Sequence, residues 1–149
     1  RTIKLENFFL VYKKQDLREG EFLEYLIIPK TNMATKCYKI SKRFDQDISS
    51  VCGCFNIILD DGLLKKCVIA FGGMAGIPKR AFHLESKLLN QPWEEGVLRA
   101  SSDSLKNDFI PLSDLRSSSE YRQTSAHNLL LRCYYETLGS NTNVQQVEP

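Results

Sequence analysis

The sequence lacks any hydrophobic run near the roughly 20 residues that a membrane-spanning helix needs. It also lacks an excess of one charge, because 20 Lys and Arg stand against 18 Asp and Glu, for a formal net charge of +2. That balance disfavours nucleic acid or an anionic membrane as a partner. The first residues do not have the pattern of a secretion signal. We therefore expect a cytoplasmic protein with no membrane and no nucleic-acid partner.

Residues that commonly carry chemistry are few. There are two His and five Cys, and the odd number and scattered spacing of the Cys argue against a disulfide framework. Cys52 and Cys54 form C-x-C and would share one face of a strand, but no second pair follows at zinc or iron–sulfur spacing. His83 and His127 have no Cys or carboxylate at the spacing of a nucleophile or a metal site. We predict buried reduced thiols, no metal site and no catalytic residue.

The chain has 149 residues, of which 42% are apolar and 26% charged, the profile of one globular domain. We place this domain at residues 1–139 and a polar tail at residues 140–149. The sequence begins at Arg1 rather than at Met, which is consistent with a fragment, a processed product or a trimmed chain.

Most of the first 72 residues have the pattern of strands. Asp60-Asp61-Gly62 is a strong hairpin signal, and it separates two long apolar segments. Within the first of these segments, Val51, Phe55 and Ile57 can share one face. The expected strands are residues 8–13, 22–28, 36–42, 48–59 and 64–71, with a turn at residues 16–20.

After Gly72-Gly73 the apolar period changes from two to about 3.6. Three helices are predicted, and the longest has a capping box at Ser117 and a stop at Gly139. They are a helix with Pro78 in its first turn and a stripe of Ile77, Ala81, Leu84 and Leu88, a helix marked by Trp93, Val97, Ala100 and Ser104 or Leu105, and a helix over residues 118–138. The expected fold class is α+β, a mostly antiparallel sheet of four to five strands followed by three helices that pack on it.

Two segments could carry chemistry. The glycine-rich residues 71–80 could cradle a phosphate, but they match no phosphate-binding motif, and a tight strand-to-helix connection is the favoured interpretation. In residues 38–48, Lys39 could hold an anionic or electron-rich cofactor and Phe44 could lie beside a planar ring. The same residues also fit a solvated loop with local ion pairs. The residues alone leave both interpretations of this second segment open.

Several motifs, taken together, go further than these segments. In chain order they are Phe8-Phe9-Leu10, Leu17-x-x-Gly20-Glu21, Ile28-Pro29, Tyr38-Lys39-x-Ser41-Lys42-Arg43-x-Asp45-x-Asp47-Ile48-Ser49, Ala70-Phe71-Gly72-Gly73-Met74-Ala75, Pro78-Lys79-Arg80-Ala81, Pro92-Trp93, Asp108-Phe109-x-Pro111-Leu112-Ser113-Asp114-x-Arg116-Ser117 and Tyr121-Arg122. From about residue 5 to residue 138, the sequence resembles the C-terminal domain of the FAD-binding subunit of xanthine dehydrogenases, within the molybdenum hydroxylase family. That family includes the flavoprotein of carbon monoxide dehydrogenase.

The resemblance implies part of an oxidoreductase that is inactive on its own. In the family, electrons from purine hydroxylation at a molybdopterin centre pass through [2Fe–2S] clusters to FAD and then to NAD. The implied partners are an FAD-binding N-terminal half, an iron–sulfur domain and a molybdenum-binding subunit. Neither the glycine-rich loops of the FAD pyrophosphate site nor a cluster cysteine set is present in this sequence. The FAD site is therefore expected to be shared with the other half.

The resemblance implies two cofactor-binding residues. Lys39 matches a family lysine near the flavin, and Leu23 matches an apolar position that touches the cofactor. The loop from residue 40 to residue 50 matches one near the flavin, although Phe44 stands where relatives often carry a charge. The alternative function is a docking module that is not catalytic, in a molybdenum hydroxylase with another substrate such as CO, an aldehyde or nicotinate.

Overall fold

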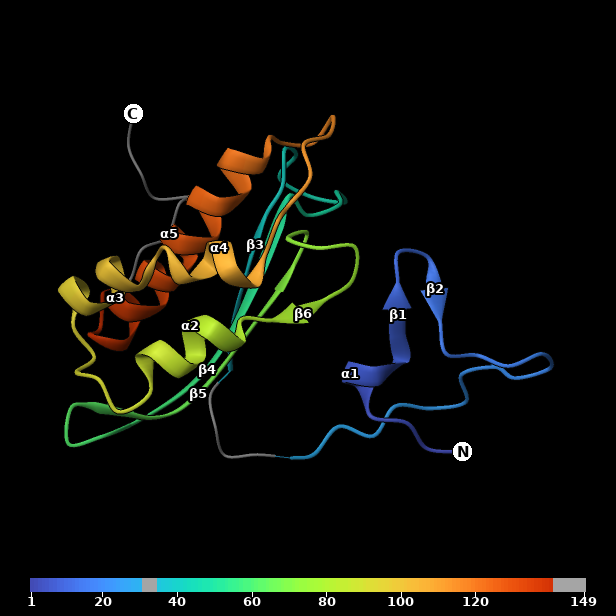
Figure 1. Cartoon of the computed structure of the whole chain (residues 1–149), viewed down its shortest axis with the longest axis horizontal. Helices are drawn as coiled ribbons and strands as arrows, with labels where there is room; N and C mark the ends of the chain where they lie inside the picture. Colours follow the sequence, from blue (N-terminus) through green and yellow to red (C-terminus); the bar gives the residue numbers. More distant parts are fainter. Residues whose placement is uncertain (31–34, 141–149) are drawn as a thin grey trace.

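The computed structural model describes residues 1–30 and 35–140. Its main sheet is antiparallel, in the order β3-β4-β5-β6, and four helices come after it in the chain (Figure 1). The strands are β3 (Thr35–Ile40), β4 (Val51–Asp60), β5 (Leu63–Gly72) and β6 (Lys79–Arg80), and the helices are α2 (Phe82–Leu88), α3 (Glu95–Ser101), α4 (Ser104–Asp108) and α5 (Ser119–Thr137). The predicted α+β class is confirmed.

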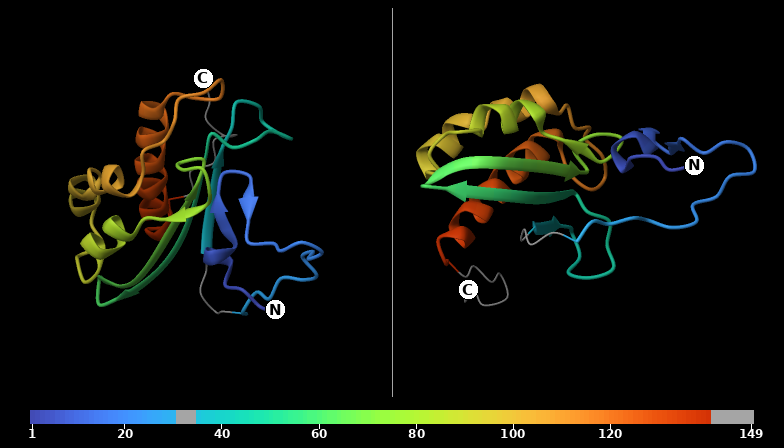
Figure 2. Two further views of the ribbon diagram at one scale, coloured as in Figure 1. Left: turned by 45° about the vertical axis from the view of Figure 1, so that its right-hand side comes forward. Right: turned by 90° about the horizontal axis from the view of Figure 1, so that it is seen from below.

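The sheet has one covered and one open face. Along β4, Val51, Gly53 and Phe55 are buried, whereas Cys52 and Cys54 between them are only partly buried. Side chains alternate across a strand, so the buried set faces the helices. Figure 2 shows the helices on one side of the strands and the N-terminal segment on the other. Helix α5 packs against β4, and α2 packs against β5.

Aromatic side chains form the centre of the core between the sheet and the helices. Phe55 and Phe71 meet edge to face, with ring centroids 5.7 Å apart, and Phe71 meets Phe109 in the same way at 5.6 Å. Leu130 on α5 and Leu84 on α2 are fully buried against the same cluster. Burial of each such side chain stabilises the fold by about 1.5–3 kcal/mol.

The hairpin between β4 and β5 forms as predicted. Asp61 and Gly62 both have positive φ, at 54° and 74°, which a two-residue hairpin turn of this kind requires. Val51 and Phe55 are buried and Ile57 packs against the core, so the predicted shared face is also confirmed.

The prediction of a helix that starts at Pro78 is wrong. Residues 79–80 instead form β6, in which Lys79 pairs with Phe71, and α2 begins at Phe82. The strand forms because the glycine-rich turn brings the chain back along the free edge of β5. The predicted stripe still has a physical basis, since Ala81, Leu84 and Leu88 are all buried.

The second predicted helix is two short helices. Helix α3 ends at Ser101 and α4 begins at Ser104, so the sheet is followed by four helices instead of three. Most of the expected stripe is confirmed, because Trp93 and Leu105 are buried and Val97 packs against the core. Ala100 is exposed instead, and the prediction missed the buried Leu98. Gly96 and the serines weaken the apolar period, which leaves several faces equally plausible in the sequence.

Helix α5 agrees closely with its prediction. Its N-cap is Ser118, whose hydroxyl accepts a hydrogen bond from the backbone N–H of Tyr121 at 3.1 Å, and not Ser117 as predicted. Gly139, with φ of 86°, follows the helix and stops it. Most of the predicted apolar face is buried, but Leu138 is exposed. Of the predicted tail, residues 141–149 lie outside the described residues.

The N-terminal segment differs most from expectation. It contains a short helix, α1 (Leu5–Phe8), and a small hairpin of β1 (Phe9–Val11) and β2 (Lys14–Gln15). The turn predicted at residues 16–20 is present, with Gly20 at φ 79°. The strand predicted for residues 22–28 is wrong, because these residues have no regular structure. A sequence of high β-propensity still needs a neighbouring strand with which to pair.

Candidate functional site

Lys39 lies on β3, at the edge of the main sheet, and points away from the helices. Its neighbour Tyr38 is buried on the helix side, where its hydroxyl donates a hydrogen bond of 2.9 Å to Glu136 on α5. Lys36 also binds that carboxylate, at 3.0 Å, and this contact fixes β3 against α5. Because side chains alternate, the exposed Lys39 emerges on the opposite face. Within residues 1–30 and 35–140 its amine makes no hydrogen bond or ion pair.

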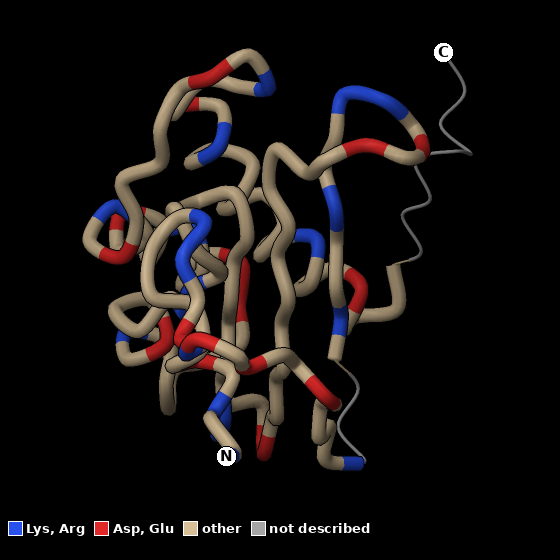
Figure 3. The backbone as a smooth tube through the Cα atoms, turned by 90° about the vertical axis from the view of Figure 1, so that its right-hand side faces the viewer, with Lys and Arg blue, Asp and Glu red and all other residues tan. Residues whose placement is uncertain are grey.

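Small side chains lie beside Lys39 on this open face. The strand register places Lys39 opposite Cys52, and Cys52 opposite Gly72 on β5. The neighbouring cross-strand row on the same face is Cys37, Cys54 and Ala70. Figure 3 looks at the molecule from the side of the N-terminal segment and shows basic residues along the edge strand, and both basic and acidic residues in the loop after it. The open face, as we call these two rows, is therefore flat and carries one free cation.

The loop of residues 41–50 follows Lys39 and is ordered by Asp47. This carboxylate accepts hydrogen bonds of 2.9 Å from the backbone N–H groups of Arg43 and Ile48. The Arg43 N–H contributes most to holding the pKa of Asp47 below its usual value. Phe44 is 83% exposed, so its ring projects outward from the loop. The Arg43–Asp47 contacts agree with a solvated loop that has local ion pairs. The exposed Phe44 ring is available for contact with another molecule.

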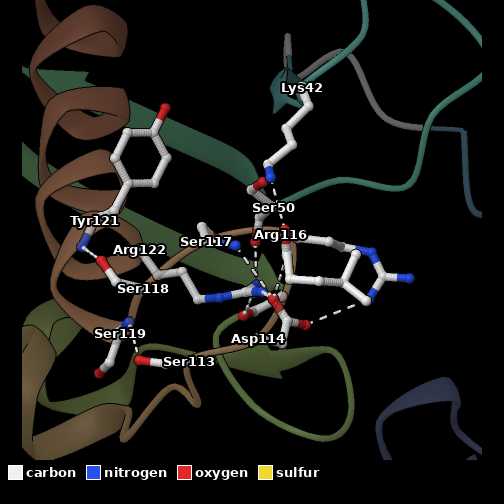
Figure 4. Close-up of polar contacts among 12 residues, drawn as sticks. Lys42, Ser50, Ser113, Asp114, Arg116, Ser117, Ser118, Ser119, Tyr121 and Arg122 are labelled. Atoms are coloured by element: carbon white, nitrogen blue, oxygen red, sulfur yellow. Dashed lines mark hydrogen bonds and ion pairs between the residues drawn. The ribbon is translucent and has the colours of Figure 1, made fainter.

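Arg122 joins this loop to the glycine-rich turn and to the residues before α5 (Figure 4). Its guanidinium is buried and donates to the backbone carbonyls of Ser50 and Gly73, and to Asp114 at 2.7 Å. Arg116 also binds Asp114, at 3.3 Å. These ion pairs fix the residues that precede α5.

A cleft of about 370 Å³ lies next to Arg122, but its charged groups are already engaged. Lys42 donates to the backbone carbonyl of Leu115 at 2.7 Å, and Arg116 binds Asp114. The cleft is lined by Ile40, Ser41, Lys42, Ser50, Arg116, Ser117, Ser118 and Tyr121. At the start of α5, the Ser113 hydroxyl accepts the N–H of Ser119 and the Ser118 hydroxyl accepts that of Tyr121 (Figure 4). These contacts hold the loop of residues 41–50 to the residues before α5, so we interpret the cleft as structural.

The glycine-rich segment is structural, as favoured from the sequence. Gly73 has φ of 81°, and a Cβ at this position would overlap the carbonyl of Ser50. Lys79 donates to the backbone carbonyl of Asp108 at 2.7 Å, and Arg80 binds Glu85 in an ion pair. The two basic residues therefore hold the turn to its neighbours.

Leu23 lies on the irregular segment, and 54% of it is exposed. Lys39 belongs to the main sheet, so the structure places the two predicted cofactor residues on separate segments. Contact of either residue with a cofactor remains a prediction. The side chains around Leu23 share its exposure and form a large apolar surface, which we call the apolar segment: Phe22, Leu23, Tyr25, Leu26, Ile27 and Ile28.

The histidines have structural surroundings. His83 is mostly exposed, and its Nδ1 lies 2.9 Å from Asp108. The same carboxylate is buried and accepts the backbone N–H groups of His83 and Leu84, so it caps α2. Burial lowers the pKa of His127. In the described part of the chain, no group of three His, Cys, Asp or Glu is placed to hold a metal ion.

All five cysteines are free thiols, as predicted, but they are not all buried. Cys67 and Cys133 are core residues, whereas Cys37 is exposed and Cys52 and Cys54 are partly buried on the open face. No local pattern indicates that Cys37 lies opposite Cys54, because strand register decides which residue of β3 occupies that position.

Comparison with known proteins supports the resemblance found in the motifs. Residues 36–137 match the family described as the CO dehydrogenase flavoprotein C-terminal domain. This chain belongs to that family. The matched range contains the main sheet, all four helices that follow it, and Lys39. Leu23 and the apolar segment precede the range.

Two curated relatives carry names from xanthine metabolism. The chain is 32% identical over 116 residues to xanthine dehydrogenase of Oryza sativa subsp. japonica, which covers 74% of this chain and 8% of the relative. It is 33% identical over 94 residues to the xanthine dehydrogenase FAD-binding subunit of Escherichia coli O157:H7, which covers 63% of this chain and 32% of that subunit. The chain therefore spans less than a third of either relative.

A solved structure supports the fold. The quinoline 2-oxidoreductase structure from Pseudomonas putida 86 superimposes with a TM-score of 0.81, over 91% of this chain and 47% of that chain, at 19% identity. This likeness shows that the two chains share the fold. No helix in residues 1–30 and 35–140 is long and apolar enough to cross a membrane.

Proposed function

We propose that this chain forms one wall of the flavin site in a molybdenum hydroxylase of the xanthine dehydrogenase type, where electrons from purine hydroxylation pass to NAD. The observation that carries the proposal is the open face, where the unpaired amine of Lys39 stands beside Cys52 and Gly72. The two named relatives favour the xanthine type.

The open face suits the edge or face of a planar ring. Small side chains next to Lys39 let a flat group approach the sheet, and the amine can donate to an electron-rich oxygen or nitrogen. The exposed Phe44 in the following loop offers an aromatic surface nearby in the chain. Bound FAD would supply the redox chemistry, while the chain supplies position and charge.

The described residues fit a shared FAD site better than a complete one. In the glycine-rich turn, the carbonyl of Gly73 accepts a hydrogen bond from Arg122, and Gly73 itself packs against the carbonyl of Ser50. We therefore assign this turn no role in phosphate binding. The proposal therefore needs the FAD-binding N-terminal half as a partner, and with it the iron–sulfur domain and the molybdenum-binding subunit of such an enzyme. Leu23, on the segment before the sheet, is proposed as an apolar contact of the cofactor.

Replacement of Lys39 by Ala tests the proposal in an enzyme assembled from this chain and an FAD-binding half. We expect the dissociation constant for FAD to rise about tenfold or more, because a charged hydrogen-bond donor is lost. The measurements are the flavin-to-protein ratio after gel filtration and the rate of NADH formation with xanthine. Lys39→Arg should retain part of the affinity.

Lys66→Ala is the matched control, because Lys66 is an exposed lysine near the opposite end of β5. It should leave both flavin content and NADH formation unchanged. Equal flavin content and equal NADH formation in the Lys39→Ala and Lys66→Ala enzymes would remove Lys39 from the flavin site.

A second candidate function is docking to other subunits without cofactor contact, and the apolar segment favours it. Phe22 and Ile28 are 79% and 81% exposed, and exposed apolar patches of this kind mark interaction surfaces. Ile27→Asp together with Ile28→Asp should weaken assembly under either function. Only the flavin-wall function requires that Lys39→Ala change flavin content in an enzyme that still assembles.

A further inference from the structure

Two cysteines of the open face are in contact across the sheet edge. Cys37 on β3 and Cys54 on β4 are direct register partners, and their Sγ atoms are 2.8 Å apart. Direct partners on antiparallel strands have Cα atoms about 4.5–5.5 Å apart, which lies within the range of about 4.4–6.8 Å for disulfides. Closure to a bond of about 2.05 Å therefore requires only a small movement of the two side chains.

The surroundings distinguish this pair from the other thiols. Cys37 is exposed on an edge strand, so a reagent can reach it without opening the core. Cys67 and Cys133 are buried, and Cys52 lies opposite Lys39 in the neighbouring row. Cys37 and Cys54 are thus the pair that combines access with an Sγ–Sγ contact between two strands.

We propose that Cys37 and Cys54 form a reversible cross-strand disulfide, which makes the pair a thiol-modification site on the open face. The oxidant is a low-molecular-weight disulfide of the glutathione class. The proposal is independent of the flavin assignment, because it uses only contacts between β3 and β4. It extends to residues for which neither the family nor the proposed function provides a role.

The reaction is thiol–disulfide exchange in two steps. Cys37 loses its proton to solvent and its thiolate attacks one sulfur of oxidised glutathione, so that a mixed disulfide forms and one glutathione leaves. Cys54 then attacks the Cys37 sulfur, loses its proton to solvent, and displaces the second glutathione. The chain loses two electrons and two protons, and the oxidised glutathione becomes two reduced molecules.

The order of attack follows from the two environments. Burial raises the pKa of the Cys54 thiol to about 12, and contact with Cys37 adds to the effect. Cys54 is therefore less often deprotonated than an unperturbed thiol, and only the thiolate is a nucleophile. The exposed Cys37 is the entry point, and Cys54 resolves the mixed disulfide that forms 17 residues before it in the chain.

Oxidised glutathione is the probe for the test, applied to the full chain under native conditions. Thiols are then counted in denaturant, and peptides are mapped without a reductant. We expect the free thiols to fall from five to three, a loss of two. The mapped link should join Cys37 to Cys54, and dithiothreitol should restore all five thiols.

Two variants sharpen the test. Cys54→Ser should stop the reaction at a stable glutathione adduct on Cys37, whereas Cys52→Ser should still give the Cys37–Cys54 link. A wild-type chain that keeps glutathione on Cys37 with Cys54 free would overturn the proposal. So would a link from Cys37 to Cys52, or retention of all five thiols, and the wild-type map decides these outcomes even if a variant fails to fold.

Discussion

Arg122→Met should destabilise the fold strongly, because the buried guanidinium ties three segments together. Arg122 is 3% exposed and donates to the carbonyls of Ser50 and Gly73 as well as to Asp114. Methionine retains most of the apolar stem and removes every donor. The variant therefore tests the hydrogen bonds more than the packing.

The two carbonyl contacts set the magnitude. A hydrogen bond to a charged group contributes about 1.5–3 kcal/mol, and loss of the donor leaves each buried acceptor unsatisfied. The free energy of unfolding should therefore fall by about 3–5 kcal/mol. For a chain of this length that corresponds to a melting temperature lower by about 10 °C or more.

Urea unfolding followed by circular dichroism measures this change, with Arg99→Met as the control. Arg99 forms an exposed pair with Glu95 on α3, and such pairs contribute little. The control should unfold close to the wild type. If Arg122→Met and Arg99→Met unfold at the same urea concentration, the guanidinium does not hold the loop, the turn and α5 together.

The remaining stability predictions concern single positions in the same region. Gly73→Ala should lower the free energy of unfolding by about 2–4 kcal/mol, because the added Cβ would overlap a carbonyl. Gly62→Ala, with open space around the residue, should lower it by about 1 kcal/mol. Equal losses in thermal unfolding would contradict this account. Ser118→Ala should cost about 1 kcal/mol and Ser117→Ala almost nothing, and the reverse order would return the N-cap to Ser117.

Acid unfolding tests Asp114. Burial alone would raise the pKa of this carboxyl, but the N–H groups of Arg116 and Ser117 and the Arg122 guanidinium outweigh burial and lower it from 3.8 to about 2. Its stabilising contribution is therefore complete above pH 3.8 and is lost as pH falls through about 2. Unfolding measured between these pH values should depend less steeply on pH in Asp114→Asn, and an unchanged slope would contradict the pairing.

Local signals in the sequence were sufficient for β3, β4, β5 and α5. The turn at Asp61 and Gly62 and the stop at Gly139 each depend on a backbone conformation that few residues adopt easily, so these signals are strong. The α+β fold class and the order of strands before helices followed from these signals. The start of α2 at Phe82 could not be predicted, because Lys79 and Arg80 pair with the edge of β5 through a tertiary contact.

The site was predictable only in part. Side chains alternate along β3 once the strand is known, so Lys39 lies on the other face of the strand from the buried Tyr38. The cross-strand partners Cys52 and Cys54 depend on register, which no local pattern specifies. The apolar segment was mistaken for a strand because its branched and aromatic residues have high β-propensity, but a strand also needs a neighbouring strand with which to pair.

The reactivity of the Lys39 amine is the most direct test of the flavin wall. An enzyme assembled with an FAD-binding half would be treated briefly with acetic anhydride, with FAD bound and after its removal, and acetylation at each lysine would be measured by mass spectrometry. The account predicts that FAD protects Lys39 severalfold while the exposed Lys66 reacts equally in both states. Equal acetylation of Lys39 with and without FAD would contradict a flavin site on this face of the sheet.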